Sequence, residues 1–217
     1  MRILILTHGR SGGLSISSWI EKELGLTLFH EPFIQNDIEF LKNIVYKKDN
    51  IVVKDFPFNI KQKGLDLNEF MQTFDKIIIH KRVDTKEIAI STAHGWLRSK
   101  VDKNKISHWH VTYELSEEWL LKNKKIIEQE IIDILIRNKD LYEIYDNEKI
   151  MGIRTTYENI FENIDDINKL IEYLEIKNPK WLDVLSKRHK LRNGDVGMDD
   201  YLMLNPNKFI ETKRRLL

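Results

Sequence analysis

Apolar and polar positions along the chain fall into blocks of two kinds. Short aliphatic runs that end in polar clusters predict four buried strands, at Ile3–Leu6, Ile51–Val53, Lys76–His80 and Ile150–Ile153. Between the runs, apolar residues recur at helical spacing, as in Ile16, Trp19, Ile20 and Leu24. Strands that alternate with helices predict a parallel sheet with right-handed crossover connections.

Helical spacing also dominates the second half of the chain. From Ser116, a candidate N-cap, an apolar series runs from Trp119 to Leu135 and predicts one long helix or two abutting helices. A further helix is expected near Asp165 to Leu174. With 217 residues, 41% of them hydrophobic, and neither a repeat nor a linker, we expect a single domain over residues 1–217.

Charge and cysteine content narrow the classes of function. Lys plus Arg (35) nearly balance Asp plus Glu (34), so bulk charge gives no reason to expect nucleic acid as a partner. The absence of cysteine excludes disulfides, a thiolate catalyst and thiolate metal ligands. No apolar run is long enough for a membrane span, and no signal peptide is recognised, so we expect a soluble, cytoplasmic protein.

The first predicted strand runs into a glycine-rich turn, from Gly9 to Gly13, and then into a helix. Such a turn gathers unpaired backbone N–H groups and the positive end of the helix dipole, so it favours an anion, above all a phosphate. The P-loop of nucleotide hydrolases, G-x-x-x-x-G-K-[ST], requires a Lys-Ser or Lys-Thr pair that is missing here. The scaffold is therefore P-loop-like, but its chemistry should differ.

Four further polar stretches follow the glycine turn, and two of them lie at the ends of predicted strands. Leu28–Phe33 reads LFHEPF, Lys54 and Asp55 leave the second predicted strand, and Arg82 ends the third, with Ser91 further along the following helix. Ligands of parallel sheets bind beyond the carboxyl ends of the strands, where these residues are expected. A glycine-containing basic loop, LRNGDVG, occupies Leu191–Gly197.

Together these stretches resemble the sulfotransferase family that uses 3′-phosphoadenosine 5′-phosphosulfate as sulfuryl donor. Arg10-Ser11-Gly12-Gly13 resembles the family's [RK]-S-G turn, which holds the 5′-phosphosulfate, and Phe29–Pro32 is similar to its F-x-E-P pattern. Arg82 with Ala89-Ile90-Ser91 resembles the element that binds the 3′-phosphate. Tyr157–Ile160 and Arg192–Gly197 resemble two later family motifs. The order of the motifs carries the resemblance.

The resemblance implies a fold and a donor site. The expected fold is a three-layer α/β/α domain with a central parallel sheet and a P-loop-like phosphosulfate-binding turn. The donor, which leaves as adenosine 3′,5′-bisphosphate, would be bound without a metal by Arg10, Ser11, Gly12, Gly13, Leu14, Ser15, Arg82, Ser91, Tyr157, Arg192, Asn193 and Gly194. Leu14 and Ser15 stand where the family often has an adenine-stacking aromatic, so that role passes to Trp19 or Tyr157.

The resemblance also implies catalytic roles. Arg10 would hold the sulfuryl end of the donor, and Glu31 would accept the acceptor's proton, with His30 and Asp55 as alternative bases. Lys54 would polarise the leaving phosphate or orient the acceptor. Arg82 and Ser91 are one residue further apart than in the family, and we place this insertion in the Val83–Thr85 turn, before the helix.

The expected function is sulfuryl transfer, by in-line attack, to a hydroxyl or amine of a small-molecule or glycan acceptor. One alternative is a phosphotransferase in which Asp55 holds Mg²⁺, and another is a non-catalytic nucleotide-binding protein on the same fold. Simpler structural readings also remain: Arg82 could pair with Asp84 or Glu87, and Lys54 with Asp55. His108 and His110 lack a third ligand nearby, so we expect no metal site there, and their stretch should line the acceptor pocket or form a covering segment.

Overall fold

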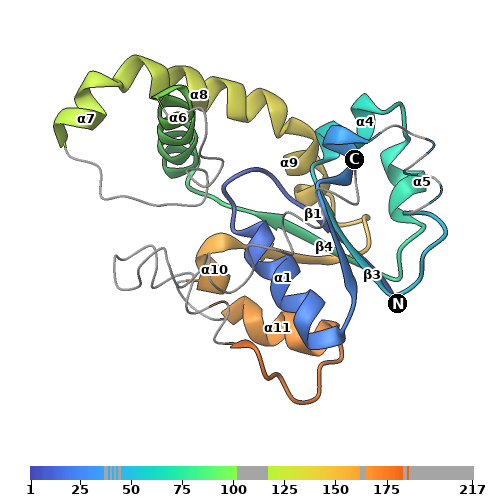
Figure 1. The fold of residues 1–217 in the computed structure, drawn as a ribbon. Coiled ribbons are helices and arrows are strands. Elements are labelled where there is room, and N and C mark those ends of the chain that lie inside the picture. The colour runs from blue at the N-terminus through green and yellow to red at the C-terminus, as the bar shows by residue number, and fades with distance from the viewer. Residues whose placement is uncertain are drawn as a thin grey trace.

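The part of the chain that the structure describes folds around a five-stranded sheet. The computed structural model (Figure 1) describes residues 1–36, 39, 41, 43, 45–101, 117–161, 165–182 and 185, with backbone alone at 35 and 94–101. The strands are β1 (Arg2–Leu6), β2 (Thr27–His30), β3 (Ile51–Asp55), β4 (Lys76–Lys81) and β5 (Ile153–Thr156). They pair in the order β2-β3-β1-β4-β5, all parallel, which confirms an α/β fold.

The three central strands lie where the aliphatic runs predict them. β1, β3 and β4 are buried along almost their whole length, because parallel strands in the middle of a sheet are covered on both faces. β1 pairs with β3 on one side and with β4 on the other. In the pair with β3, Arg2 lies opposite Ile51 and Leu6 lies opposite Asp55. The carboxyl ends of these three strands therefore meet at one edge.

The two outer strands differ from the sequence prediction. β5 begins at Ile153, where the apolar run 150–153 was expected to end. The preceding residues form a turn, because Gly152 adopts a φ of 136° against the carbonyl of Ile77 and the Arg154 guanidinium donates to the carbonyl of Asn147. β2, which is four residues long and within the described residues pairs with β3 alone, was not predicted as a strand.

The helices largely follow the predicted spacing. They are α1 (Gly13–Leu24), α2 (Pro32–Gln35), α4 (Pro57–Gln62), α5 (Leu67–Met71), α6 (Thr85–Val101), α7 (Glu117–Lys122), α8 (Lys124–Arg137), α9 (Lys139–Asp146), α10 (Tyr157–Phe161) and α11 (Asp165–Tyr173). The long apolar series thus forms two abutting helices, α7 and α8, as one of the two expectations stated. Its expected N-cap, Ser116, lies outside the described residues.

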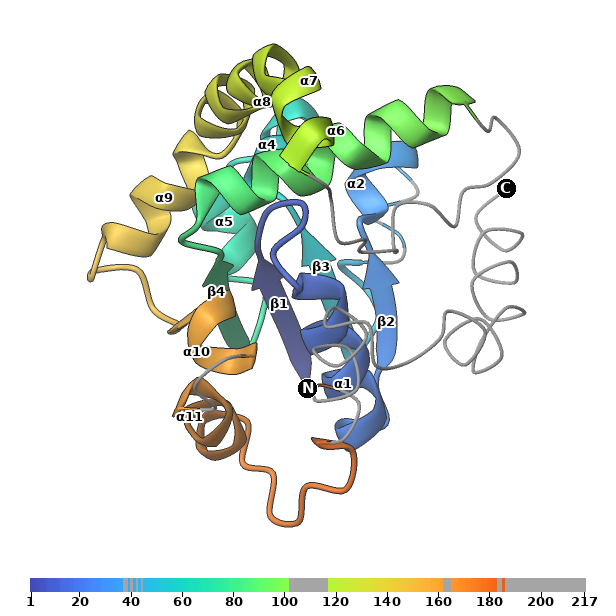
Figure 2. The ribbon, with the colours of Figure 1, turned by 90° about the vertical axis from the view of Figure 1, so that its left-hand side faces the viewer.

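Side chains of the strands alternate between two apolar clusters. Leu4 and Leu6 of β1 pack with side chains of α5 and α9, whereas Ile3 and Ile5 pack with those of α1, α10 and α11. Figures 1 and 2 show α10 and α11 beside α1, and α4, α5 and α9 together on the other side of the strands. The described helices therefore cover both faces of the sheet.

The order of the strands creates a topological switch point. The chain leaves β1 through α1 toward β2, and it leaves β4 in the opposite direction toward β5. β1 and β4 are neighbours, so the loops that follow them leave the sheet in opposite directions, and ligands of open α/β sheets bind at such switch points. The loop after β1 is the glycine-rich turn, and the loop after β4 begins with Arg82.

A third apolar cluster joins α6 to α8. Ile88, Ala89 and Ala93 of α6 pack against Ile127 and Ile134 of α8. Figure 1 shows this helix pair above the carboxyl edge of the sheet, next to the loop that follows β1. No helix within the described ranges has the length and apolar character that crossing a membrane requires.

Candidate functional site

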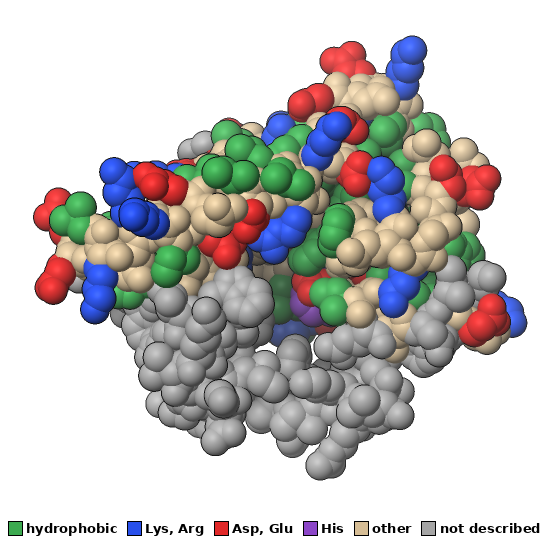
Figure 3. Space-filling view, turned by 90° about the horizontal axis from the view of Figure 1, so that it is seen from above, with side chains coloured by type: hydrophobic (Ala, Val, Ile, Leu, Met, Phe, Trp, Pro, Cys, Tyr) green, Lys and Arg blue, Asp and Glu red, His purple; other side chains and the backbone are tan. Residues whose placement is uncertain are grey.

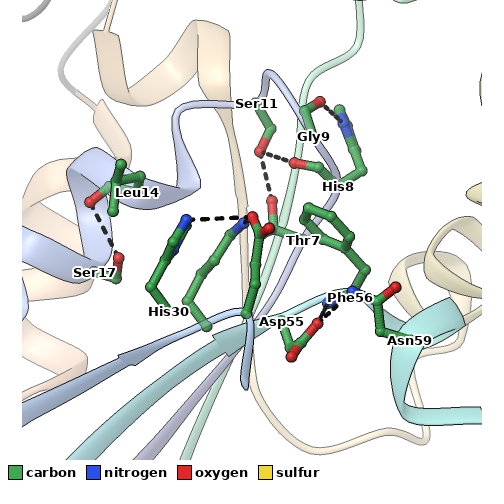
Figure 4. A network of polar contacts seen from close by, with 12 residues as sticks. Thr7, His8, Gly9, Ser11, Leu14, Ser17, His30, Asp55, Phe56 and Asn59 are labelled. Atoms are coloured by element: carbon green, nitrogen blue, oxygen red, sulfur yellow. Dashed lines mark hydrogen bonds and ion pairs between the residues drawn. The ribbon is translucent and has the colours of Figure 1, made fainter. Parts of the chain in front are cut away.

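The turn after β1 is held by its own hydroxyl groups. Thr7 Oγ1 and Ser11 Oγ lie 2.6 Å apart, and Ser11 Oγ donates to the carbonyl of His8 at 2.7 Å (Figure 4). The Gly12 carbonyl accepts from the amides of Ser15 and Ile16, so α1 starts directly after the turn. The first turn of α1 contains no acidic residue, which leaves the positive end of its dipole uncompensated by helix side chains.

Two of the glycines in this turn are required by close packing. Gly12 has a φ of 82°, and a Cβ there would lie 2.5 Å from Cε2 of Phe161 in α10. A Cβ on Gly13 would lie 2.7 Å from Cγ2 of Thr7 and 3.3 Å from Cε of Lys54. The turn is therefore pressed against α10 on one side and against the Lys54 side chain on the other.

Lys54 and Asp55 are neighbours in sequence but face opposite sides of the sheet, since side chains alternate along β3. The Lys54 ammonium is buried under the turn, where it forms a salt bridge with Oε1 of Glu31 and lies 4.1 Å from the ring centre of Phe56. Burial lowers the pKa of Lys54, and the Glu31 carboxylate opposes this change. The buried charge of Lys54 is thus compensated by Glu31 rather than by Asp55.

Glu31 is held in an uncommon backbone conformation. It stands between β2 and α2 with a φ of 51°, and its N–H donates to the carbonyl of Lys54 at 2.7 Å. His30 Nε2 lies 3.4 Å from Oε1 of the same carboxylate. Arg10 is also left-handed, with a φ of 63°. Such strain in non-glycine residues persists where the surroundings fix it, and it is frequent at functional sites.

Asp55 has a structural task. Its Oδ2 accepts from the amide of Phe33, and its Oδ1 accepts from the amide of Phe56 and from Nδ2 of Asn59. Burial raises the pKa of Asp55 to about 6, and the three donors oppose the rise. With both oxygens engaged in anchoring α2 and α4, Asp55 is poorly placed as the base or as the Mg²⁺ ligand considered from the sequence.

The two arginines meet α6 on one face. Arg10 Nε donates to Ser91 Oγ at 2.7 Å, and Arg82 Nη2 lies 3.3 Å from Oε2 of Glu87. Glu87 and Ser91 are four residues apart on α6, so they share a face. The structure therefore brings Arg10, Arg82 and Ser91 together, and Arg82 also forms one of the ion pairs that the sequence allowed.

Val83 and Asp84, where the sequence analysis places the extra residue between Arg82 and Ser91, form the turn before α6. Helix α6 begins at Thr85, and Asp84 caps it by accepting from the amide of Glu87 at 2.9 Å. The Glu158 carboxylate accepts from the amides of Val83 and Asp84. A side chain of α10 thus holds this turn in place, and the insertion itself stays a prediction.

Both aromatic candidates for stacking the adenine are buried, but their neighbours differ. Trp19 is wrong for this role, because it is fully buried in the core and its Nε1 donates to Glu23 one helical turn away. Tyr157 is also largely buried, with its ring centre 4.6 Å from the Arg82 guanidinium carbon and 4.7 Å from the Phe161 ring. Its position connects the glycine turn to Arg82, and its role toward adenine stays a prediction.

Two buried histidines that the sequence analysis did not single out connect the turn to β4. His8 Nε2 accepts from the amide of Arg82 at 3.0 Å, and His8 Nδ1 lies 2.8 Å from the carbonyl of Gly9. His80 Nε2 lies 2.7 Å from the carbonyl of Ser11, and its Nδ1 lies 2.9 Å from Thr155 Oγ1. Burial lowers the pKa of each imidazole to about 4. In the sequence, the position of each histidine at or just after the end of a predicted buried strand could have indicated this role.

The site opens into a hollow on the carboxyl side of the sheet. Figure 3 shows a histidine with acidic and basic side chains at the floor of this hollow. In the part of the chain that the structure describes, no three His, Asp or Glu side chains gather as metal ligands would. Arg192, Asn193 and Gly194, like His108 and His110, lie outside the described residues.

Comparison of the sequence with models of known protein families gives no match, and comparison with curated proteins gives none either.

The packing of Gly12 leads to a stability prediction. Gly12→Ala should reduce the free energy of unfolding by about 1–3 kcal/mol, because the new Cβ is both strained at positive φ and in contact with Phe161. Gly9→Ala is the matched control, since a Cβ there meets no atom within 4 Å, and it should change stability by about 0.5 kcal/mol at most. Urea unfolding measures both, and equal effects would contradict the assigned packing.

The buried histidines lead to a pH prediction. Between pH 6.5 and about 4 the unfolded chain binds protons at His8 and His80 that the folded protein excludes, so stability should fall as the pH is lowered through this window. Asp55 acts in the opposite direction, because its raised pKa lets the folded protein bind a proton first. Each group contributes on the order of 3 kcal/mol over its window, so the two histidines prevail.

Urea unfolding at pH 7 and pH 4.5 measures this difference. His80→Gln removes one of the two histidines and should flatten the pH dependence. Stability that stays constant between these pH values would contradict neutral, buried imidazoles.

Proposed function

We propose that the protein is a sulfotransferase that moves a sulfuryl group from 3′-phosphoadenosine 5′-phosphosulfate to a hydroxyl or amine. The observation that carries this proposal is the gathering of Arg10, Arg82 and Ser91 on one face of α6, beside a glycine turn at the switch point of the sheet. The motifs that resemble the sulfotransferase family contribute all of these residues. An intracellular donor of this kind also agrees with a cytoplasmic location.

The donor has two anionic ends, and the site offers cations from two strand ends. Arg10, the amides of the turn and Lys54 would bind the 5′-phosphosulfate, and Arg82 with Ser91 would bind the 3′-phosphate. Helices on both faces of the sheet and the turn at the start of α1 support the three-layer arrangement and the P-loop-like role of the turn. The three-layer arrangement and the phosphosulfate-binding role of the turn are parts of this proposal.

The residues of the site favour sulfuryl transfer over phosphotransfer with magnesium. The turn lacks the Lys-Ser or Lys-Thr pair that P-loop phosphotransferases use, and Asp55 is engaged with three N–H donors. A phosphosulfate needs less charge neutralisation than a triphosphate, so backbone N–H groups and side-chain cations suffice.

Glu31 is the base in this proposal. As the acceptor oxygen forms its bond to sulfur, the bond from sulfur to the 5′-phosphate oxygen breaks, and the acceptor's proton passes to the Glu31 carboxylate. The bisphosphate leaves with an additional negative charge, which Lys54 and Arg10 stabilise. The Lys54 salt bridge and the contact with His30 orient the carboxylate toward this task.

The acceptor would enter from the side of α2 and α4. Both helices begin at amides that Asp55 holds, and they flank the Glu31–Lys54 pair. Exposed Ile34 and Phe58 on these helices offer apolar contact, and polar groups of the hollow offer hydrogen bonds. A small-molecule or glycan acceptor fits this mixture.

Binding of adenosine 3′,5′-bisphosphate without magnesium is the test of the proposed function. At about a hundred times Kd, the ligand should add roughly 2.7 kcal/mol of stability and raise Tm by about 5–10 °C. Arg82→Ala should weaken binding by about 10- to 100-fold, because it removes charge-assisted hydrogen bonds worth about 1.5–3 kcal/mol. Calorimetry measures Kd and thermal unfolding measures Tm.

The controls separate the alternatives. Arg137→Ala removes an arginine of α8 that pairs with Glu130, and it should leave binding unchanged. The ligands 5′-AMP and ATP test whether the second phosphate is required. Stabilisation by ATP with magnesium, and none by the bisphosphate, would replace this proposal with a phosphotransferase.

Glu31→Gln tests the assigned base. The variant should bind the bisphosphate with nearly unchanged Kd, while turnover with an acceptor panel falls by about 10²- to 10⁴-fold, since the amide cannot accept the proton. Glu143→Gln, which makes the same change at an exposed carboxylate of α9 that pairs with Lys139, is the matched control and should retain the activity. Full turnover in Glu31→Gln would remove Glu31 from the mechanism, and binding without any turnover in the wild type would favour a nucleotide-binding protein.

A further inference from the structure

His8 is a buried imidazole with two different hydrogen-bond partners. It lies two residues after β1 and is 1% exposed. The Arg82 amide can only donate, so Nε2 of His8 carries no proton and accepts at 3.0 Å. The proton of the neutral ring is then on Nδ1, which donates to the carbonyl of Gly9 at 2.8 Å. One ring therefore spans from the glycine turn to the first residue after β4.

This bridge lies beyond the end of the strand ladder. The pairing of β1 with β4 ends at Leu6 and Ile79, so the backbone ladder does not connect His8 to Arg82. The two residues are 74 positions apart in the chain. The imidazole thus continues the connection between the strands at the point where they diverge around the candidate site.

The second histidine has a different geometry. His80 Nε2 approaches the carbonyl of Ser11, and its Nδ1 approaches the Thr155 hydroxyl on β5. His80 therefore holds the far end of the turn to the sheet but does not contact the Arg82 backbone. Only His8, of these two rings, links the turn directly to the cationic residue.

We propose that His8 is a positioning residue of the anion site: it fixes the Arg82 backbone relative to the glycine turn, so that guanidinium and turn amides face the same bisphosphate. This inference depends on the proposed function. The Tyr157 ring and Glu87 restrict the conformation of the Arg82 side chain. A shift of the Arg82 backbone therefore moves the guanidinium with it. Small displacements of a binding group cause large losses.

Two isosteric replacements separate the two hydrogen bonds. His8→Gln carries its amide oxygen about as far from the backbone as Nε2, so it retains an acceptor for the Arg82 amide. His8→Asn carries its amide at about the place of Nδ1, so it retains a donor for Gly9 and loses the contact with Arg82. We expect His8→Asn to weaken adenosine 3′,5′-bisphosphate binding at least about 10-fold, and His8→Gln by less than about threefold.

Kd from calorimetry and Tm without ligand are measured for each variant. Equal loss of affinity in both variants, or none in either, would overturn the positioning role, because a ring that only fills space does not distinguish them. Should His8→Asn fail to fold, His8→Leu, which retains volume but has no polar atom, takes its place beside His8→Gln. Failure of the wild type to bind the bisphosphate would instead overturn the proposed function.

An independent measurement uses the wild-type protein. A long-range ¹H–¹⁵N spectrum of the histidine rings should show His8 neutral, with the proton on Nδ1 and a hydrogen-bonded Nε2. A charged ring, or a proton on Nε2, would overturn the bridge to Arg82 whatever the ligand.

Discussion

The alternation of side chains along buried parallel strands is the constraint on which the site depends. It sends Lys54 toward the glycine turn and Asp55 to the opposite face, although the two residues are adjacent. The counter-ion of Lys54 is Glu31, directly after the neighbouring strand β2. Asp55, on the opposite face, binds the backbone amides at the starts of α2 and α4. The end of β3 thus supplies both the Lys54 cation of the candidate site and the Asp55 carboxylate that anchors two helices.

Two buried cations of the site, Lys54 and Arg82, are paired with carboxylates of the protein. Glu31 compensates Lys54, Glu87 compensates Arg82, and the two histidines between them are neutral. Arg82 is 5% exposed whereas the Glu87 side chain is 47% exposed, so a ligand phosphate that displaces Glu87 returns that carboxylate to water at little cost. The arrangement can exchange an internal anion for an external one without leaving a buried charge alone.

Sequence patterns predicted the sheet better than the contacts within the site. Aliphatic runs located β1, β3 and β4, but Arg154 obscured β5, and β2 was too short for its pattern to be recognised. Motif order brought Arg10, Arg82 and Ser91 into one hypothesis, yet which arginine contacts Ser91 depends on how α6 packs. The burial of Trp19 was readable from the apolar helix face that it shares with Ile16 and Ile20, whereas His8 and His80 gain their roles only from strand register.

The anchoring of α2 and α4 by a single carboxylate has a consequence for divergence. Because Asp55 binds the amides of Phe33 and Phe56, the spacing between the two helices is set by backbone groups and not by their outward side chains. Exposed residues such as Ile34 and Phe58 can therefore be exchanged while the frame stays unchanged. Evolution, or a designer, can vary one wall of the hollow without moving the groups beneath it.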